Sequence, residues 1–128
     1  VLLDINDLKV INDSYGHLIG DDVIKGFAQK LKKNIRKTDI IGRLGGDEFI
    51  GIFFNTNKQD LDKKFQNFLE KLEQENLIIE GNRIKCSFSY GIATFPQDGT
   101  SFKELVKAAD HRMYLFKERY KAKNRLKV

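Results

Sequence analysis

The sequence has little of three things that would point to particular classes of protein. Its 128 residues include one cysteine, Cys86, which excludes an internal disulfide framework and a cysteine-rich zinc site. The only proline is Pro96, and no stretch rich in proline, glycine or serine interrupts the chain, so we expect one domain. No run approaches the roughly 18 apolar residues of a membrane-spanning helix. What remains is a chain with 41% apolar residues, long enough to bury one core.

The positive charge of the chain is concentrated at one end. The formal net charge is +5, and residues 117–128 hold six basic residues and one acidic residue, so the rest of the chain carries equal numbers of each sign. A nucleic-acid-binding protein would normally spread its basic residues over a face or a groove. We therefore interpret this stretch as a solvated end, with a phosphate-contacting segment as the alternative, and expect no nucleic-acid partner.

Alternating and continuous apolar stretches predict the strands. We expect them over residues 1–3, 40–44 and 49–54, with two more within 77–95 and a weaker signal near 124–128. In the later pair, every second residue from Ile84 to Ile92 is apolar or aromatic, which makes Cys86 a core residue rather than a nucleophile. The mixture of hairpins and helices favours an α+β sandwich over a doubly wound parallel sheet.

Four helices are expected between these strands. A short helix with Leu8, Ile11 and Tyr15 on its apolar face ends at Gly16, and a longer one begins after Gly20. A third helix falls near residues 61–72. The last helix is opened by an S-x-x-E capping box at Ser101 and Glu104. Its predicted apolar face consists of Phe102, Leu105, Val106, Ala109 and Met113.

Three acidic residues are predicted at exposed ends of the sheet. Asp4 follows the first strand, and Asp47 and Glu48 lie in a hairpin turn after two glycines. Carboxylate oxygens suit Mg²⁺, which keeps several waters and is shared with substrate phosphates. Acids in turns are more often simple turn residues, but Lys9 and Asn12 flank the first acid on the following helix. A lysine there could neutralise charge during phosphoryl transfer.

Residues 43–49, R-L-G-G-D-E-F, resemble the signature of the GGDEF-domain diguanylate cyclases. Residues 4–21 are similar to the first conserved block of that family, residues 87–99 to its later strand and turn, and residues 108–114 to its last helix. The blocks occur in order and at matching spacing over nearly the whole chain. Because the family's usual Leu-Thr-x-Leu-x-Asn-Arg run before the first strand is absent, we expect residues 1–128 to be an N-terminally truncated piece of a larger protein.

The resemblance implies a fold and a reaction. The fold would be a mostly antiparallel five-stranded central sheet flanked by helices, like the palm of nucleotide polymerases and class III adenylate cyclases. The reaction would condense two GTP molecules, one on each domain of a homodimer, into cyclic di-GMP with release of two pyrophosphates. The resemblance further implies a cytoplasmic domain joined to an upstream sensory domain, and leaves membrane anchoring of the parent protein open.

The resemblance also implies roles around the metal and the phosphates. Asp4 and Asp47 would be Mg²⁺ ligands, with Mn²⁺ as the alternative ion and the carbonyl of Ile5 assisting. Glu48 would hold a second metal ion. Asp47 would in addition accept the proton of the attacking hydroxyl group, and Lys9 would contact phosphate and stabilise the transition state.

Four further positions match the family's nucleotide-binding residues. Asn12 and Asp21 match the guanine-reading positions, His17 matches a position at the nucleotide edge, and Lys117 matches a phosphate-binding lysine. A carboxylate can accept hydrogen bonds from both N1–H and N2–H₂ of guanine, a pattern that adenine lacks. Asp21 would therefore favour GTP over ATP, although taken alone it is equally well a helix N-cap.

Arg36 and Asp39 precede the glycine pair at the spacing of the family's inhibitory R-x-x-D site. The resemblance implies that cyclic di-GMP binds there as a feedback inhibitor, with the planar guanidinium of Arg36 gripping guanine or phosphate and Asp39 helping. The alternative is a surface ion pair between the two side chains. Asn6 departs from the family pattern, which often has a second aspartate at that position.

We expect an active diguanylate cyclase with product feedback, and three alternatives remain open. The first is a catalytically silent GGDEF domain that acts as a receptor for cyclic di-GMP or GTP; retention of Asp47 and Glu48 argues against it. The second is a cyclase for a mixed guanine–adenine dinucleotide, which Asp21 disfavours. The third is a basic nucleic-acid-binding domain, which the local placement of the positive charge disfavours.

Overall fold

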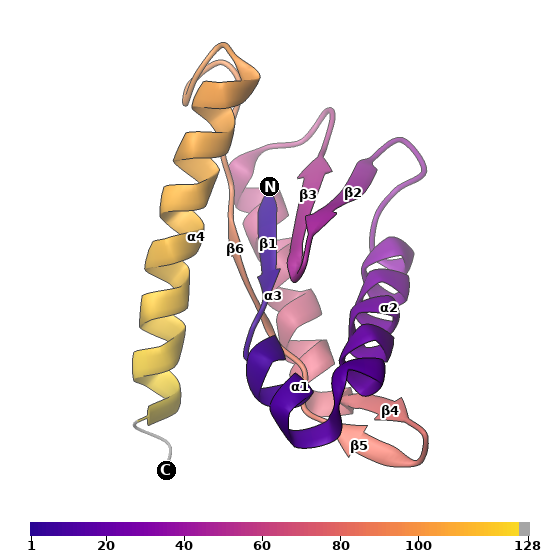
Figure 1. The fold of residues 1–128 in the computed structure, drawn as a ribbon. Coiled ribbons are helices and arrows are strands. Elements are labelled where there is room, and N and C mark those ends of the chain that lie inside the picture. The colour runs from indigo at the N-terminus through magenta and orange to yellow at the C-terminus, as the bar shows by residue number, and fades with distance from the viewer. Residues whose placement is uncertain (126–128) are drawn as a thin grey trace.

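Four antiparallel strands form the central sheet of the structure, a computed structural model that describes residues 1–125 (Figure 1). Their order across the sheet is β2–β3–β1–β6. The strands are β1 (Leu2–Ile5), β2 (Ile40–Gly45), β3 (Glu48–Ile52) and β6 (Phe88–Gly91). A separate two-stranded ribbon pairs β4 (Leu77–Ile79) with β5 (Asn82–Ile84). The predicted α+β class with an antiparallel sheet is confirmed, although the central sheet of the described residues has four strands rather than five.

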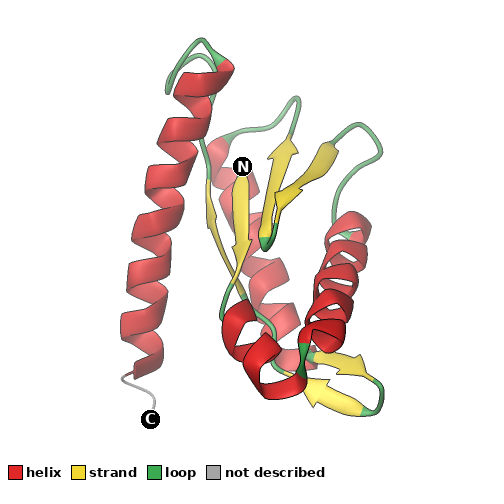
Figure 2. Ribbon diagram, in the orientation of Figure 1, coloured by secondary structure: helices red, strands yellow, loops and turns green. Residues whose placement is uncertain are grey.

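The helices cover the sheet from two sides. They are α1 (Leu8–Tyr15), α2 (His17–Lys33), α3 (Lys58–Glu75) and α4 (Phe102–Arg125). Figure 2 shows α4 running alongside β6 while α3 lies behind the strands. Within residues 1–125, no helix combines the length and the apolar character needed to cross a membrane.

An aromatic cluster joins α2 and α3 to one face of the sheet. The ring of Phe27 lies 5.3 Å from that of Phe49 and 5.5 Å from that of Phe88, measured between ring centres. The ring of Phe68, on α3, lies 5.2 Å from that of Phe88. Since burial of one such side chain contributes about 1.5–3 kcal/mol, this cluster is a main source of stability.

The two-residue period of β1 divides its side chains between two packing environments. Leu3 and Ile5 lie in the cluster with α2 and α3, whereas Leu2 packs in another with Ala109 and Met113 of α4. Asp4 alternates with Leu3 and shares the face of Leu2. The alternation therefore directs the carboxylate of Asp4 toward α4.

Several local predictions were wrong in detail. The second helix begins at His17 rather than after Gly20, so Asp21 lies inside the helix and is not its N-cap. Tyr15 and Phe102, predicted to face the core, are 47% and 65% exposed. The last helix continues through Arg125, so the expected final strand fails at residues 124–125, and its remainder, 126–128, lies outside the described residues.

Other local predictions are confirmed. Cys86 is 1% exposed, and burial raises the pKa of its thiol to about 12, so it is a core residue without thiolate character. The capping residues meet as expected at the start of α4. The backbone N–H of Glu104 donates to the Oγ of Ser101 at 3.1 Å, and that hydroxyl donates to the carboxylate of Glu104 at 3.0 Å.

A salt bridge fastens the turn after β6 to α4, and we predict that it gives the protein part of its stability above pH 4. Two hydrogen bonds from Arg112, at 2.7 and 2.8 Å, assisted by the backbone N–H of Thr94, hold the pKa of Asp98 well below its usual range. Because the folded-state pKa is depressed, the contribution is present above the unfolded-state pKa of about 4 and is lost as the pH falls below it.

The variant Arg112→Met should therefore be less stable than the wild type at pH 6. Between pH 4 and pH 2 its stability should fall by less than that of the wild type, because the salt bridge is already absent. The measurement is the urea midpoint as a function of pH, with Arg119→Met on the exposed surface of the same helix as control. Parallel pH profiles for wild type and Arg112→Met would contradict the prediction.

Candidate functional site

The end of β1 and the turn of the β2–β3 hairpin meet at one end of the sheet. Asp4 lies opposite Glu48 in the antiparallel pairing of β1 with β3. The next residue, Ile5, donates its backbone N–H to the carbonyl oxygen of Asp47 at 2.9 Å. This pairing brings Asp4 to Asp47 and Glu48, which lie more than forty positions further along the sequence.

Two glycines and an arginine shape the hairpin turn. Gly45 and Gly46 have φ angles of 144° and 53°, which residues with a Cβ rarely adopt. Arg43 closes the turn by donating from Nε and Nη2 to the carbonyl of Gly46, at 3.0 and 2.9 Å. The turn thereby presents Asp47 and Glu48, both half-buried, beside the end of β1.

The prediction of an exposed acid after the first strand is wrong for Asp4, which lies inside β1 and is buried and only partly satisfied. Its exposed fraction is 5%, one oxygen accepts a hydrogen bond from Nζ of Lys117, and the other, Oδ1, has no hydrogen-bond partner. Burial, together with the neighbouring carboxyl group of Asp47, raises the pKa of Asp4 to about 6, while Lys117 acts in the opposite direction. An unsatisfied buried carboxylate oxygen is costly, which makes it a candidate for a ligand to a cation.

Lys117 reaches this carboxylate from α4. Burial by itself would lower the pKa of the lysine, but the hydrogen bond and charge of Asp4, with the charges of Asp47 and Glu48, raise it above its usual value. The ammonium group therefore stays charged among the three acids. The predicted phosphate-binding lysine thus lies at the predicted metal ligand.

A buried asparagine for which the sequence predicted no function holds the end of β1. Asn6, 7% exposed, accepts a hydrogen bond from Oγ of Ser89 at 2.8 Å and donates from Nδ2 to Oγ of Ser87 at 3.1 Å. Its backbone N–H donates to the carbonyl of Ser87 at 2.9 Å. These bonds fix the segment that follows Asp4. The departure from the family pattern at position 6 was the signal that could have identified this residue.

The predicted guanine-reading residues lie on α1 and α2, which pack against each other. The carboxamide of Asn12 occupies the space in which a side chain at position 20 would stand: a Cβ on Gly20 would lie 1.6 Å from Oδ1 of Asn12. Asp21 follows Gly20 directly and is exposed, as are Lys9 in the first turn of α1 and His17 at the start of α2. The structure thus places the carboxamide of Asn12 against Gly20, the residue before Asp21, and leaves the side chains of Lys9 and His17 in solvent.

Arg36 and Asp39 form a second, separate unit in the loop between α2 and β2. Arg36 donates to Asp39 from Nε at 3.3 Å, from Nη2 at 3.0 Å and from its backbone N–H at 2.8 Å. Asp39 is 8% exposed; although burial would raise its pKa, these bonds hold the pKa below its usual range. The guanidinium also donates to the carbonyl of Phe54 at 2.5 Å, so its orientation is fixed from two sides.

The donor set at the end of β1 fits Mg²⁺. Within residues 1–125, no group of three or more histidine, cysteine, aspartate or glutamate side chains converges on one point. Mg²⁺ does not need such a cage, because it commonly binds through one or two carboxylates, waters and substrate phosphates. The buried, unpartnered Oδ1 of Asp4 beside the carboxyl group of Asp47 meets that requirement.

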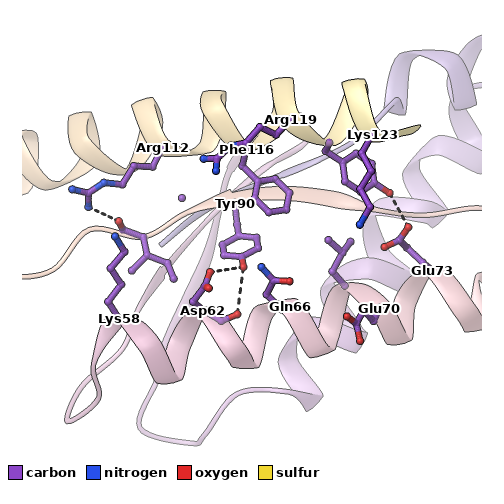
Figure 3. A pocket seen from close by; sticks show the side chains of 14 residues that line it. Lys58, Asp62, Gln66, Glu70, Glu73, Tyr90, Arg112, Phe116, Arg119 and Lys123 are labelled. Atoms are coloured by element: carbon purple, nitrogen blue, oxygen red, sulfur yellow. Dashed lines mark hydrogen bonds between the residues drawn. The ribbon is translucent and has the colours of Figure 1, made fainter. Parts of the chain in front are cut away.

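A cleft of about 500 Å³ between α3 and α4 contains none of these residues (Figure 3). Its floor includes Tyr90, whose hydroxyl donates to the carboxylate of Asp62 at 2.7 Å, and near one end the hydroxyl of Tyr120 donates to Glu73 at 2.9 Å. Both tyrosine hydroxyl groups therefore have their partners within the cleft.

Comparison with known proteins places nearly the whole chain in one family. The family described as diguanylate cyclase, GGDEF domain, matches residues 1–123. The chain is 41% identical over 125 residues to the signaling protein YkoW of Bacillus subtilis and 31% identical over 118 residues to diguanylate cyclase A of Treponema denticola. The alignments cover 96% and 92% of this chain, which spans only 16% and 32% of those two proteins.

Solved structures show the same fold. The GGDEF domain of YfiN (TpbB) from Pseudomonas aeruginosa superimposes with a TM-score of 0.87 at 28% identity, covering 92% of this chain and 74% of that one. The GGDEF domain of DgcB from Caulobacter crescentus, crystallised in complex with c-di-GMP, gives a TM-score of 0.82 at 26% identity, covering 91% and 70% of the two chains.

Proposed function

Because the chain belongs to the GGDEF-domain diguanylate cyclase family, we propose that it condenses two GTP molecules into cyclic di-GMP and two pyrophosphates. The observation that carries the proposal is the buried, unpartnered oxygen of Asp4 beside Asp47 and Lys117. Such a group is expensive to maintain in a fold unless a ligand uses it.

In the proposed reaction each 3′-hydroxyl group attacks the α-phosphate of the GTP on the facing domain. A bond from oxygen to phosphorus forms as the bond to pyrophosphate breaks, and the proton of the hydroxyl group passes to Asp47. Lys9 neutralises charge on the phosphates. Asp4, Asp47, Glu48 and the carbonyl of Ile5 would hold Mg²⁺ or Mn²⁺, which when bound polarises the phosphate oxygens.

A homodimer is part of this proposal. One domain holds one GTP, so the two attacking hydroxyl groups meet the opposite α-phosphates only when two sites face each other about a two-fold axis. A monomer would bind nucleotide without turning it over.

The guanine base is proposed to bind at the junction of α1 and α2, read by Asn12 and Asp21, with His17 at its edge. We predict that Gly20→Ala weakens GTP binding roughly tenfold without loss of stability, because the new Cβ displaces the carboxamide of Asn12 while alanine favours the helix by about 1 kcal/mol.

Calorimetric titration with GTP measures this effect. Gly26→Ala is the matched control in the same helix, since its Cβ would contact only the side chain of Leu77 at 3.5 Å. Equal GTP affinity in Gly20→Ala and wild type would remove Asn12 from the guanine site.

Feedback inhibition by cyclic di-GMP is proposed at the Arg36–Asp39 unit. The buried carboxylate of Asp39 is proposed to orient the guanidinium of Arg36, which is 47% exposed in its side chain and so open to a ligand. We predict that Arg36→Ala raises the inhibitory concentration of cyclic di-GMP at least tenfold, because roughly this much affinity is lost with one charged bidentate contact.

The rate of pyrophosphate release at increasing cyclic di-GMP tests this site. Arg36→Lys keeps the charge beside Asp39 and should also weaken inhibition because it lacks the planar fork. Lys37→Ala, at the adjacent exposed position, serves as control. An inhibition constant in Arg36→Ala equal to that of the wild type would rule out the proposed inhibitory site.

The proposed activity itself is tested by mass analysis of the products formed from GTP and Mg²⁺. The chain is held as a dimer by a fused coiled coil, so that failure to associate does not mask the chemistry. Formation of cyclic di-GMP supports the proposal. A folded dimer that binds cyclic di-GMP but forms none would instead indicate the receptor.

A further inference from the structure

The ion pair between Lys117 and Asp4 joins two residues with different proposed partners. Asp4 is a proposed ligand of the metal ion, and Lys117 is a proposed ligand of the phosphates, yet here the ammonium group donates to Oδ2 of Asp4. We propose that Lys117 is a displaceable counter-ion, an inference that rests on the proposed function. Its ammonium group holds Asp4 when no nucleotide is bound, and it moves to the phosphates of GTP when a divalent cation takes its place.

The surroundings of α4 confine this exchange to the lysine side chain. Arg112 ties the helix to the carbonyl of Ile92 at 2.7 Å and to Asp98. Gly91 of β6 lies so close to α4 that a Cβ would stand 2.0 Å from the carbonyl oxygen of Ala109. The backbone of the helix is therefore held against the sheet, whereas the four-carbon stem of a lysine can swing without moving it.

An open cleft gives the ammonium group somewhere to go. A space of about 690 Å³ adjoins the site, and its walls include Asn6, Asp7, Lys117 and Lys121. The wall carries Lys117 and Lys121 one helical turn apart, together with the acidic residues Asp7 and Glu118, so the two ammonium groups rather than a net positive charge would contact phosphates. The side chain of Lys117 is 31% exposed, so it already borders solvent.

Charge explains why the two partners compete at Asp4, although the lysine holds Oδ2 and leaves Oδ1 open. With the lysine in place, an arriving divalent cation meets a positive charge on the carboxylate that it would bind, so binding of the metal alone is weakened. Nucleotide phosphates offer the lysine a new partner and free the carboxylate. The metal and the nucleotide should therefore bind with positive coupling, and this coupling should depend on Lys117.

The test is binding of Mn²⁺ alone, without nucleotide, measured by electron paramagnetic resonance at pH 8, where Asp4 is ionised. Lys117→Met should bind Mn²⁺ about tenfold more tightly than the wild type, as expected for removal of one close positive charge. Lys121→Met removes the same charge from the same cleft and should change the affinity less than about twofold.

A second measurement uses the wild-type protein and so does not depend on the folding of a variant. The side-chain nitrogen resonance of Lys117 should shift on addition of Mg²⁺ without nucleotide, because the ammonium group leaves Asp4. An unchanged Mn²⁺ affinity in Lys117→Met, or an unchanged resonance at saturating Mg²⁺, would overturn the exchange and leave the proposed cyclase intact. If Asp4→Asn bound Mn²⁺ with the affinity of the wild type, the metal would bind elsewhere. That result would overturn both the exchange at Lys117 and the metal site of the proposed cyclase.

Discussion

Replacement of Asp47 by asparagine is expected to lower the rate of cyclic di-GMP formation at least roughly 10²- to 10³-fold, the usual loss when a charge-stabilising group is removed from an active site. Asparagine keeps the shape of the side chain, and the Ile5–Asp47 backbone hydrogen bond remains. The lost carboxylate is the proposed metal ligand and proton acceptor. GTP binding should remain close to that of the wild type, because Asn12 and Asp21 lie on α1 and α2.

Two readouts separate this effect from unfolding. Product is quantified by mass after incubation with GTP and Mg²⁺, and GTP affinity is measured by calorimetry on the same preparation. Asp110→Asn, which changes an exposed carboxylate on α4, is the matched control and should retain full activity. If Asp47→Asn turned over GTP at the wild-type rate, the metal and proton-acceptor assignments would both be removed.

The second large effect concerns stability. Gly91→Val is expected to destabilise the fold by about 3 kcal/mol or more, the upper part of the range for overpacking. A Cβ at position 91 would lie 2.0 Å from the carbonyl oxygen of Ala109 and 2.5 Å from the backbone nitrogen of Met113. Both atoms belong to the backbone of α4, so the contact is relieved only by separating α4 from β6.

Urea unfolding followed by circular dichroism gives the free energy of unfolding. Gly42→Val, in strand β2, is the matched control because the nearest atom to its Cβ is a methyl carbon of Ile50 at 3.9 Å. Comparable midpoints for the two variants would mean that β6 and α4 are not held as closely as described. A destabilised Gly91→Val should also lose activity, since α4 carries Lys117.

Local chemistry made much of this molecule predictable. The consecutive glycines before Asp47 predicted the hairpin turn, the alternation around Cys86 predicted buried side chains, and Ser101 with Glu104 predicted the start of α4. The single strand expected around Cys86 is wrong, because Cys86 lies between β5 and β6, which belong to different sheets. Each feature depends on residues within a few positions of one another, so the sequence alone contains the interaction. The resemblance of four ordered blocks predicted the family for the same reason, because each block is a short contiguous string.

Where the prediction failed at Gly20, packing between two helices decided the structure. Gly20 is a poor helix former and suggested a break before the long helix. In the folded protein the helix passes through it, and the missing side chain leaves the space that the carboxamide of Asn12 fills. Phe102 follows the helical period but is the first residue of α4 and is 65% exposed.

The sequence by itself determined the family, the hairpin that carries Asp47, and the residue types available to bind metal and nucleotide. Only the tertiary structure decided which of them meet. The ammonium group of Lys117 and the carboxylate of Asp4 are 113 positions apart, and the two serines that fix Asn6 are 81 and 83 positions from it. Contacts over such separations arise when α4 and β6 pack onto β1, because burial of apolar side chains selects the packing and the polar groups at its edge are then brought together.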